Sequence, residues 1–181
     1  MSSPIGHALA GYAAGVLVAG RDERAATFPA HTRDRVILFA GLACLPDVDF
    51  LFGAHSMYTH SIGAVLLVTI AAAVALRSSW RIVAACVVAY ASHLLLDWLG
   101  NDTSPPIGIM ALWPFNSVYY QVPVPIFLPV SRRYWLPNFW QYNLMVVGIE
   151  IALFGSLALA AHWYVNRGRA RGVQNRLQSL Q

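Results

Sequence analysis

The sequence contains no lysine, so all twelve of its basic residues are arginine. Charge of either sign is scarce, because only 11% of the 181 residues are charged, against about 25% in soluble domains. Hydrophobic residues make up 57% of the chain, and the mean hydropathy is +0.53. This composition excludes an ordinary soluble domain, and the length indicates one domain embedded in a membrane.

Cysteine is also scarce. Cys44 and Cys86 lie inside apolar runs and form no CxxC motif, which excludes a zinc knuckle and a redox dithiol. We therefore expect both to be small buried apolar residues. The chain has no glycine-rich phosphate loop, serine nucleophile elbow or HExxH motif either. A hydrolase with this sequence would therefore depend on a metal to activate water.

The arginines lie in the gaps between apolar runs and not beside aromatic platforms. The net charge of +4 and the pI near 9.4 therefore fit membrane topology better than nucleic-acid binding. We expect membrane lipid as a partner and no direct contact with nucleic acid. The first arginine, Arg21, follows the first apolar run, which is the wrong order for a cleaved signal peptide, so we expect that run to be retained.

Five apolar segments predict an all-α integral membrane bundle of about five helices. Their expected ranges are 4–20, 36–45, 58 or 59 to 76, 82–99 and 143–165. Residues 100–142 are rich in proline and aromatic residues, which predicts an irregular segment with tryptophans at headgroup level. We expect one membrane-embedded domain over residues 1–166, with the irregular insertion at about 100–142, and an arginine-rich cytoplasmic tail over 167–181.

Arginine counts predict the orientation. Ten arginines lie in 21–35, 77–81 and 167–181, and only Arg132 and Arg133 lie in the opposite connections 53–58 and 100–142. The positive-inside rule places the first group in the cytoplasm, as in a multi-pass inner (plasma) membrane protein. If the helices alternate in direction, the first and third begin, and the second and fourth end, at the non-cytoplasmic face.

Those helix ends carry the candidate metal ligands. Carboxylate and imidazole groups suit zinc and similar divalent metals, and ionisable residues in an apolar membrane protein are functional candidates. His93 and Asp97 are four residues apart and therefore share one helix face. The predicted site holds one or two ions, most simply zinc, with manganese as an alternative. Its candidate ligands are His7, Asp47, Asp49, His60, His93 and Asp97.

Several roles stay open at this point. Asp47 and Asp49 repel one another unless a cation lies between them. We therefore expect one of them to bind the metal, while capping a turn could be the whole role of the other. His60 is expected in the first turn of the third helix. His55 and Asp49 are the catalytic candidates. His55 could contact the substrate, transfer a proton or simply be exposed to solvent. Glu150 could complete the site or pair with an arginine.

The ordered motifs resemble a known family. They are, in order, an early His7, Leu-Pro-Asp-Val-Asp at 45–49, His-x3-Thr-His-Ser at 55–61, His-x3-Asp at 93–97 and Leu-Trp-Pro-Phe at 112–115. Together they resemble the motifs of the membrane-bound metal-dependent hydrolases, which are labelled LexA-binding, inner-membrane-associated hydrolases. The resemblance covers about residues 5–116. Many members carry a histidine where this chain has Phe50.

The order of ligands is also similar to that of zinc-dependent phospholipase C and the P1-type nucleases, which are helical enzymes that cleave phosphoesters with clustered zinc ions. This resemblance implies that Asp97 bridges two metals and that His7, Asp47 or Asp49, His60 and His93 complete the ligand set. The phospholipases bind a further zinc through a later histidine pair and a glutamate. Beyond Asp97 this chain offers only His162 and Glu150, so a three-metal cluster is not expected.

The expected function is therefore hydrolysis of a phosphoester, in a small-molecule, lipid or lipid-linked substrate, at the non-cytoplasmic face. Arg132 and Arg133 could bind its phosphate or only anchor their segment. Three other readings remain. The protein could be a metal or proton transporter, a haem protein with two axial histidines, or a membrane-anchored regulator with a protein partner.

Overall fold

The computed structural model describes residues 1–20, 31–52, 55–76 and 79–178. These residues are helical or irregular and contain no strand beyond two isolated bridges. The α-helices are α1 (Pro4–Ala19), α2 (Thr32–Cys44), α3 (Ile62–Leu76), α4 (Trp80–Leu99), α5 (Phe139–Glu150) and α6 (Ser156–Gln178). Three short helices join them: η1 (Leu45–Phe52), η2 (Tyr58–His60) and the π-helical η3 (Ile151–Gly155). The predicted all-α class is confirmed.

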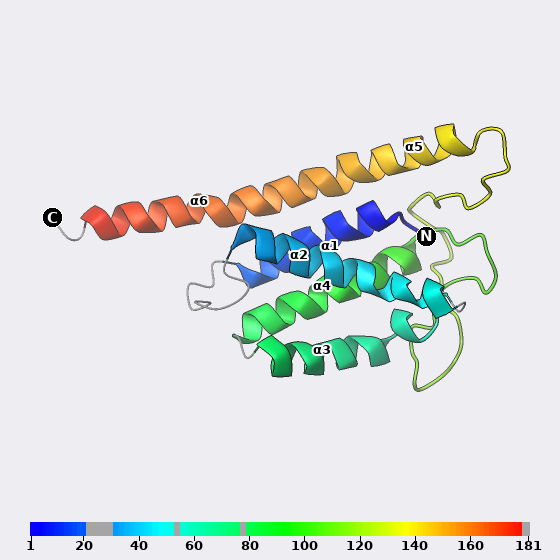
Figure 1. Cartoon of the computed structure of the whole chain (residues 1–181), viewed down its shortest axis with the longest axis horizontal. Coiled ribbons are helices and arrows are strands. Elements are labelled where there is room, and N and C mark those ends of the chain that lie inside the picture. The colour runs from blue at the N-terminus through cyan, green and yellow to red at the C-terminus, as the bar shows by residue number, and fades with distance from the viewer. Residues whose placement is uncertain (21–30, 53–54, 77–78, 179–181) are drawn as a thin grey trace.

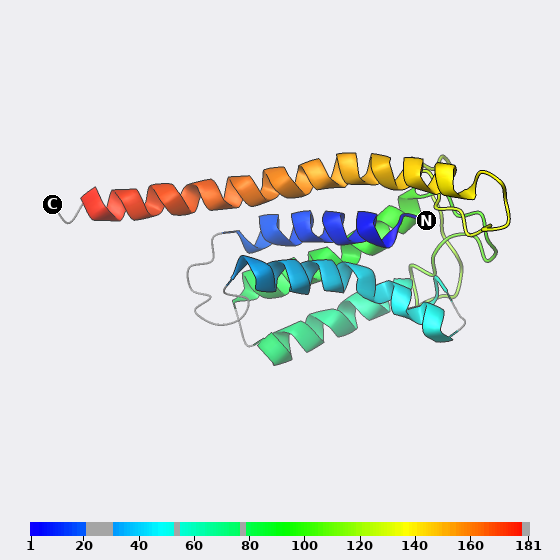
Figure 2. The ribbon, with the colours of Figure 1, turned by 45° about the horizontal axis from the view of Figure 1, so that its top comes forward.

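Helices α1 and α4 form the centre of the bundle (Figures 1 and 2). α1 contacts α2, α4 and α6, and α3 packs against α4 on the side away from α6. α5, η3 and α6 together make one continuous rod that runs along α1 and continues past the other helices. The irregular segment between α4 and α5 covers the bundle end at which α1 begins.

Two sequence features fix α1. Pro4 stands at its first turn, and the Ser3 hydroxyl accepts a hydrogen bond from the Gly6 amide at 3.1 Å as the N-cap. Gly11 and Gly15 allow α2 to approach closely, because a Cβ on Gly11 would lie 2.1 Å from the Cβ of Ala43. This is the close packing of small residues that is typical of helices in membranes.

The interior is apolar along most of its length. Its main cluster of buried residues is Val16, Ala19, Phe39, Ala72, Ile82, Ala85, Cys86, Ala89 and Val165. Cys86 is fully buried, as predicted. Cys44 is only partly buried, since it lies at the end of α2, with its Sγ atom 3.4 Å from the carbonyl oxygen of Pro4.

Four predicted boundaries are wrong. The last helix begins at Phe139, four residues before the expected residue 143. α2 begins at Thr32, four residues earlier than expected. α3 begins only at Ile62, because the Ser61 hydroxyl accepts from the Ala64 amide at 3.2 Å and so starts the helix after His60. The last helix does not end at residue 165, because the rod continues through Gln178 into the predicted tail. Residues 21–30 of the predicted polar link lie outside the described residues.

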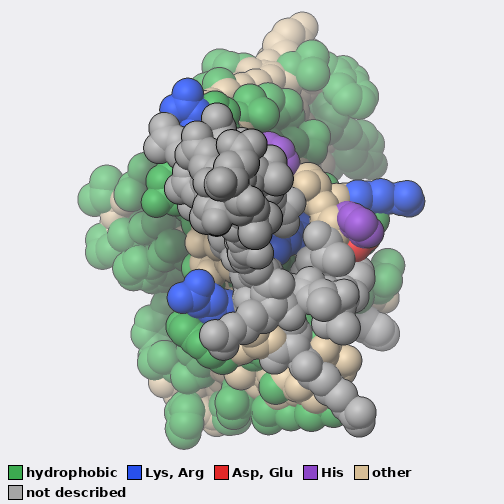
Figure 3. Space-filling view, turned by 90° about the vertical axis from the view of Figure 1, so that its left-hand side faces the viewer, with side chains coloured by type: hydrophobic (Ala, Val, Ile, Leu, Met, Phe, Trp, Pro, Cys, Tyr) green, Lys and Arg blue, Asp and Glu red, His purple; other side chains and the backbone are tan. Residues whose placement is uncertain are grey.

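Two helices of the described chain are long and apolar enough to cross a membrane, Trp80–Leu99 and Phe139–Arg167. Pro4–Ala19 and Ile62–Leu76 are apolar but shorter. Large hydrophobic side chains point outward from α3 and the rod, and they include Leu66, Leu67, Val74, Leu159 and Trp163. Figure 3, a view along the bundle, shows hydrophobic side chains around much of the rim.

Candidate metal centre

The predicted ligands meet at the end of the bundle where α1 begins. His7 comes from the first turns of α1, and His93 and Asp97 come from the last two turns of α4. Asp47 and Asp49 lie in η1, and His60 lies in η2. The structure thus brings together the helix ends that arginine counting placed on one face.

Asp97 is the centre of this cluster. Its Oδ1 atom lies 3.3 Å from Nε2 of His7, and its Oδ2 atom lies 3.1 Å from Nε2 of His93 and 3.5 Å from Nε2 of His60. All four side chains are at most 1% exposed. His7, His93 and Asp97 each offer a ligand atom within 4.8 Å of the others, which is close enough to share one ion.

A second group of possible ligands adjoins the first. Asp47, His55 and His60 also offer ligand atoms within 4.8 Å of one another. The two groups are in contact, because Nε2 of His60 lies 3.0 Å from Nε2 of His93. Oδ1 of Asp47 lies 3.6 Å from the same His93 nitrogen. Two adjacent ions, or one ion between the groups, are both compatible with this spacing.

Hydrogen bonds behind the imidazoles assign their tautomers. Nδ1–H of His93 donates to the carbonyl oxygen of Ala43 at 2.7 Å, and Nδ1 of His60 lies 3.2 Å from Oδ2 of Asp49. In their neutral forms both Nε2 atoms therefore present lone pairs to one another. A histidine held from behind in this way is the usual arrangement of a zinc ligand.

The residues fit a divalent cation. Both oxygens of Asp97 are buried and have no hydrogen-bond partner, although imidazole nitrogens surround them. A buried carboxylate without a partner is costly, and so are two lone pairs that face each other. A cation between these atoms removes both costs. Zinc, with nitrogen and oxygen ligands, matches the donor set best.

Asp49 differs from the other predicted ligands. Its Oδ2 atom accepts from the Ser56 amide and the Thr59 hydroxyl, both at 2.9 Å, besides its contact with His60. Its Oδ1 atom lies 2.9 Å from Nδ1 of His55. The carboxylate is thus occupied by donors behind two imidazoles, whereas Asp47 faces the ligand atoms of the cluster.

The charge of Asp49 has a clear electrostatic effect in the metal-free protein. Burial opposes ionisation of Asp49, but the hydrogen bonds from His55 and His60 outweigh it and hold its pKa below the usual range. Burial likewise favours neutral His60, but the nearby carboxylates of Asp49 and Asp97 outweigh it and raise the pKa of His60 to about 9. His60 is therefore protonated near neutral pH in the metal-free protein.

Sequence reasoning did not single out two residues that support the site. The Tyr90 hydroxyl donates to the carbonyl oxygen of Thr59 at 2.6 Å and so fixes η2 against α4. Tyr90 lies three residues before His93, and this spacing is its only signal in the sequence. Ser56, 2% exposed, adopts φ of 63° and directs its amide at Asp49.

Glu150 lies outside the cluster and does not complete it. Its carboxylate accepts from the backbone amide of Ser3 at 3.0 Å and from the Ser3 hydroxyl. It therefore holds the beginning of α1 against the rod, three to four residues from His7. His162 is at the opposite end of the bundle, where it bonds with Tyr12 at 2.7 Å.

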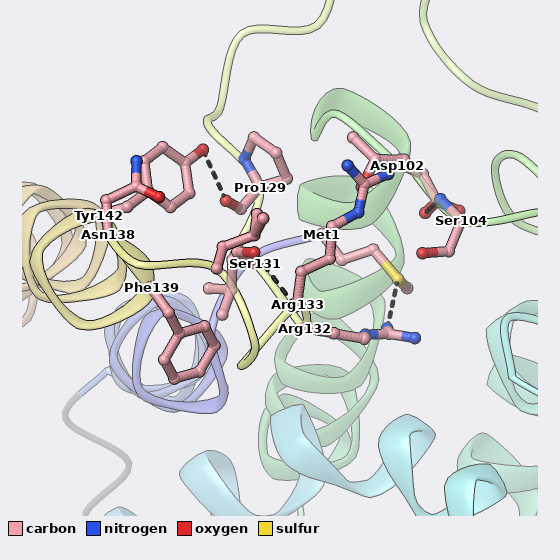
Figure 4. Close-up of a pocket in the computed structure, with 13 residues that line it drawn as sticks. Met1, Asp102, Ser104, Pro129, Ser131, Arg132, Arg133, Asn138, Phe139 and Tyr142 are labelled. Carbon is pink, nitrogen blue, oxygen red and sulfur yellow. Dashed lines mark hydrogen bonds between the residues drawn. The ribbon is translucent and has the colours of Figure 1, made fainter.

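Two pockets open beside the cluster. One, of about 290 Å³, is lined by His55, Ser56, Met57, Asp102, Ser104, Pro105, Pro106 and Arg132. We call it the His55 pocket. The other, of about 280 Å³, lies between residues 102–104, 129–133 and the start of α5, and Met1, Arg133 and Tyr142 line it (Figure 4). We call it the Tyr142 pocket. Asp102, Ser104 and Arg132 line both.

The fold and the site define a small helical protein with a buried cluster of carboxylates and imidazoles at one end of an apolar bundle. The sequence model of the YdjM inner membrane protein family matches residues 1–172, and the chain belongs to this family. Searches among curated proteins and among solved structures find no match. Family membership confirms the predicted inner-membrane protein, whereas the resemblances to hydrolases, phospholipase C and P1-type nucleases stay predictions.

Proposed function

We propose that the protein is a membrane-bound, metal-dependent hydrolase that cleaves a phosphoester. One observation carries the proposal: buried imidazole and carboxylate atoms from four separate segments converge, and the Asp97 oxygens among them lack hydrogen-bond partners. Polar groups so far from solvent are costly unless they bind something. The donor set favours zinc, with manganese second.

His7, His93 and Asp97 would hold one ion, and Asp47 and His60 would hold the same ion or a second one. Asp97 is suited to bridge two ions because its two oxygens face different histidines. When bound, such an ion lowers the pKa of a water molecule and stabilises negative charge on a phosphoryl oxygen. The protein supplies the geometry, with His60 and His93 each fixed from behind by a hydrogen bond.

His55 is suited to act as the general acid and base. Its side chain is 15% exposed and lines the His55 pocket, so a substrate can reach it. Asp49 holds its Nδ1 at 2.9 Å, which leaves Nε2 to exchange a proton with a reacting oxygen. A carboxylate behind an imidazole fixes the orientation of the ring. Asp49 therefore serves catalysis as a positioning residue.

We place the site at the non-cytoplasmic face of a multi-pass protein, which makes a lipid or lipid-linked phosphoester the expected substrate. α4 and the rod supply the spans. α1 has 16 residues and so measures about 24 Å, which is shorter than the roughly 30 Å hydrocarbon core. Such a helix leaves its first turns, with His7, close to one membrane surface. The apolar core beyond the cluster gives no support to a transport path.

Elemental analysis of the detergent-purified protein tests the proposal. We expect near-stoichiometric zinc or manganese in the wild type, loss of the metal in a His93→Ala, Asp97→Ala variant, and retention in His162→Ala, which removes an imidazole at the other end. Phosphoesterase activity on a panel of water-soluble and lipid phosphoesters should follow the metal. A folded wild type without metal would overturn the proposal and favour a regulator with a structural polar cluster.

A further inference from the structure

The thioether of Met1 occupies an unusual position between the two pockets. Its Sδ atom lies 2.9 Å from Nε2 of His55, 3.3 Å from Nη2 of Arg132 and 3.8 Å from Oγ of Ser56. Figure 4 shows the contact with Arg132. Three polar side chains thus surround one sulfur atom, and sulfur in a thioether is only a weak hydrogen-bond acceptor.

The surrounding groups suit a stronger acceptor. Arg132 and Ser56 carry protons to donate at every relevant pH, and Ser56 is almost fully buried. Among the described residues, Arg132 forms no ion pair with a carboxylate. Its guanidinium lies instead over the Phe50 ring, 4.7 Å from the centroid.

Phe50 and His55 hold this arrangement in place. The two rings are stacked, with centroids 3.7 Å apart, so that Arg132, Phe50 and His55 form one continuous stack. Asp49 fixes the far side of His55. His55 and Arg132 are therefore also held by contacts that do not involve Met1.

We propose that Ser56 and Arg132 form an oxyanion subsite, next to Nε2 of His55, for a non-bridging oxygen of a phosphate group, and that Met1 occupies this subsite until the ligand displaces it. A charged phosphate oxygen forms stronger hydrogen bonds with these groups than a thioether does. The methionine side chain is flexible enough to swing away. As a subsite of the reaction, this inference rests on the proposed function, and it places the scissile phosphate beside the general acid.

The pockets limit the size of the ligand. Each is close to 300 Å³, at the lower end of small-molecule sites, and therefore suits a phosphorylated headgroup better than a whole lipid. The Tyr142 pocket reaches the start of α5, which belongs to a candidate membrane span. A phosphate on a lipid in the adjacent membrane and a free phosphate ester both match this chemistry.

Calorimetric titration of the purified protein with inorganic phosphate tests the subsite. We expect Arg132→Gln to weaken binding about tenfold or more, as loss of a charge-assisted hydrogen bond requires. Arg133→Gln is the matched control, because it removes the same charge from the next residue, whose guanidinium does not contact the sulfur. Equal effects of the two variants, or no effect of either, would overturn the proposal.

Two further measurements separate the remaining cases. With ¹³C-methyl-methionine labelling, the Met1 signal should shift on phosphate addition while that of Met145, exposed on α5, stays fixed. A constant Met1 signal despite binding would refute the subsite. Vesicles with and without a phosphomonoester lipid distinguish a headgroup from free phosphate, and Arg132-dependent binding of either supports the proposal.

The titration is run on zinc-loaded and chelator-stripped protein. Arg132-dependent phosphate binding by a wild type that takes up no zinc would retain the subsite and reject the hydrolase. Metal binding without Arg132-dependent phosphate binding would retain the proposed hydrolase and reject the subsite.

Discussion

Substitution of Asp49 or Asp47 by asparagine distinguishes a ligand from a residue that positions one. Both changes keep the shape of the side chain and remove one charge. In Asp49→Asn the amide oxygen can still face the Ser56 amide, the Thr59 hydroxyl and His60, while the amide NH₂ faces His55. Each retained bond changes from a charge-assisted bond to a neutral one, at a cost of about 1 kcal/mol.

Of these bonds, only the one to His60 would act on a proposed metal ligand. We therefore expect Asp49→Asn to weaken zinc binding about 10- to 100-fold, or about 1.4–2.7 kcal/mol, as is usual when the partner behind a ligating histidine is changed. Asp47 faces Nε2 of His60 and of His93 directly. Loss of its charge would remove a charged ligand. Asp47→Asn should therefore weaken zinc binding by about 4 kcal/mol, or roughly a thousandfold in affinity.

Competition with a chromophoric zinc chelator measures both affinities, and circular dichroism checks that the helices remain. Asp49→Asn carries a second signature, because its NH₂ group forces His55 to accept at Nδ1 and to carry its proton on Nε2. Hydrolytic activity at saturating zinc should therefore fall further than occupancy does. If Asp49→Asn abolished zinc binding and Asp47→Asn left it unchanged, the assignment of the two carboxylates would be wrong.

Three other predictions concern separate parts of the molecule. His55→Gln should lower kcat about 10²- to 10⁴-fold with metal content unchanged, and a parallel loss of metal would contradict its role as acid and base. Gly11→Ala should destabilise the protein by about 1–3 kcal/mol through its clash with α2, whereas Gly41→Ala, with nothing near its Cβ, should be neutral or stabilising in thermal melts. The metal-free protein should lose stability as pH rises from 6.5 through about 9, because folding raises the pKa of His60 and so favours its charged form. Thermal melts at about pH 6 and pH 10 should show this loss of stability. A His60→Gln variant that lost the same stability over this range would contradict the assignment to His60.

Much of the architecture followed from the sequence because it depends on simple counts. Apolar runs predicted the helices, and arginine distribution predicted which helix ends share a face. His7, His60 and the His93–Asp97 pair then had to meet, as they do. Helix boundaries were less predictable, because the Ser61 cap competes with Tyr58 and Thr59 as a start for α3.

The separate roles of Asp47 and Asp49 could not be predicted from spacing alone. In a strand they would share a face, and in an α-helix they would not. They lie in a 3₁₀ helix, with about three residues per turn, so their side chains diverge by about 120° around its axis. The Arg132–Phe50–His55 stack was equally hidden, because it joins an irregular segment to η1 over more than eighty residues.

The bond between Glu150 and Ser3 links the order of synthesis to the assembly of the site. The first turn of α1, which carries His7, is anchored by a carboxylate that the ribosome adds about 150 residues later. A growing chain that has made α1, α2, α3 and α4 already contains every candidate ligand, yet it lacks this anchor. The anchor of the first turn of α1 can therefore form only after the rod has been made.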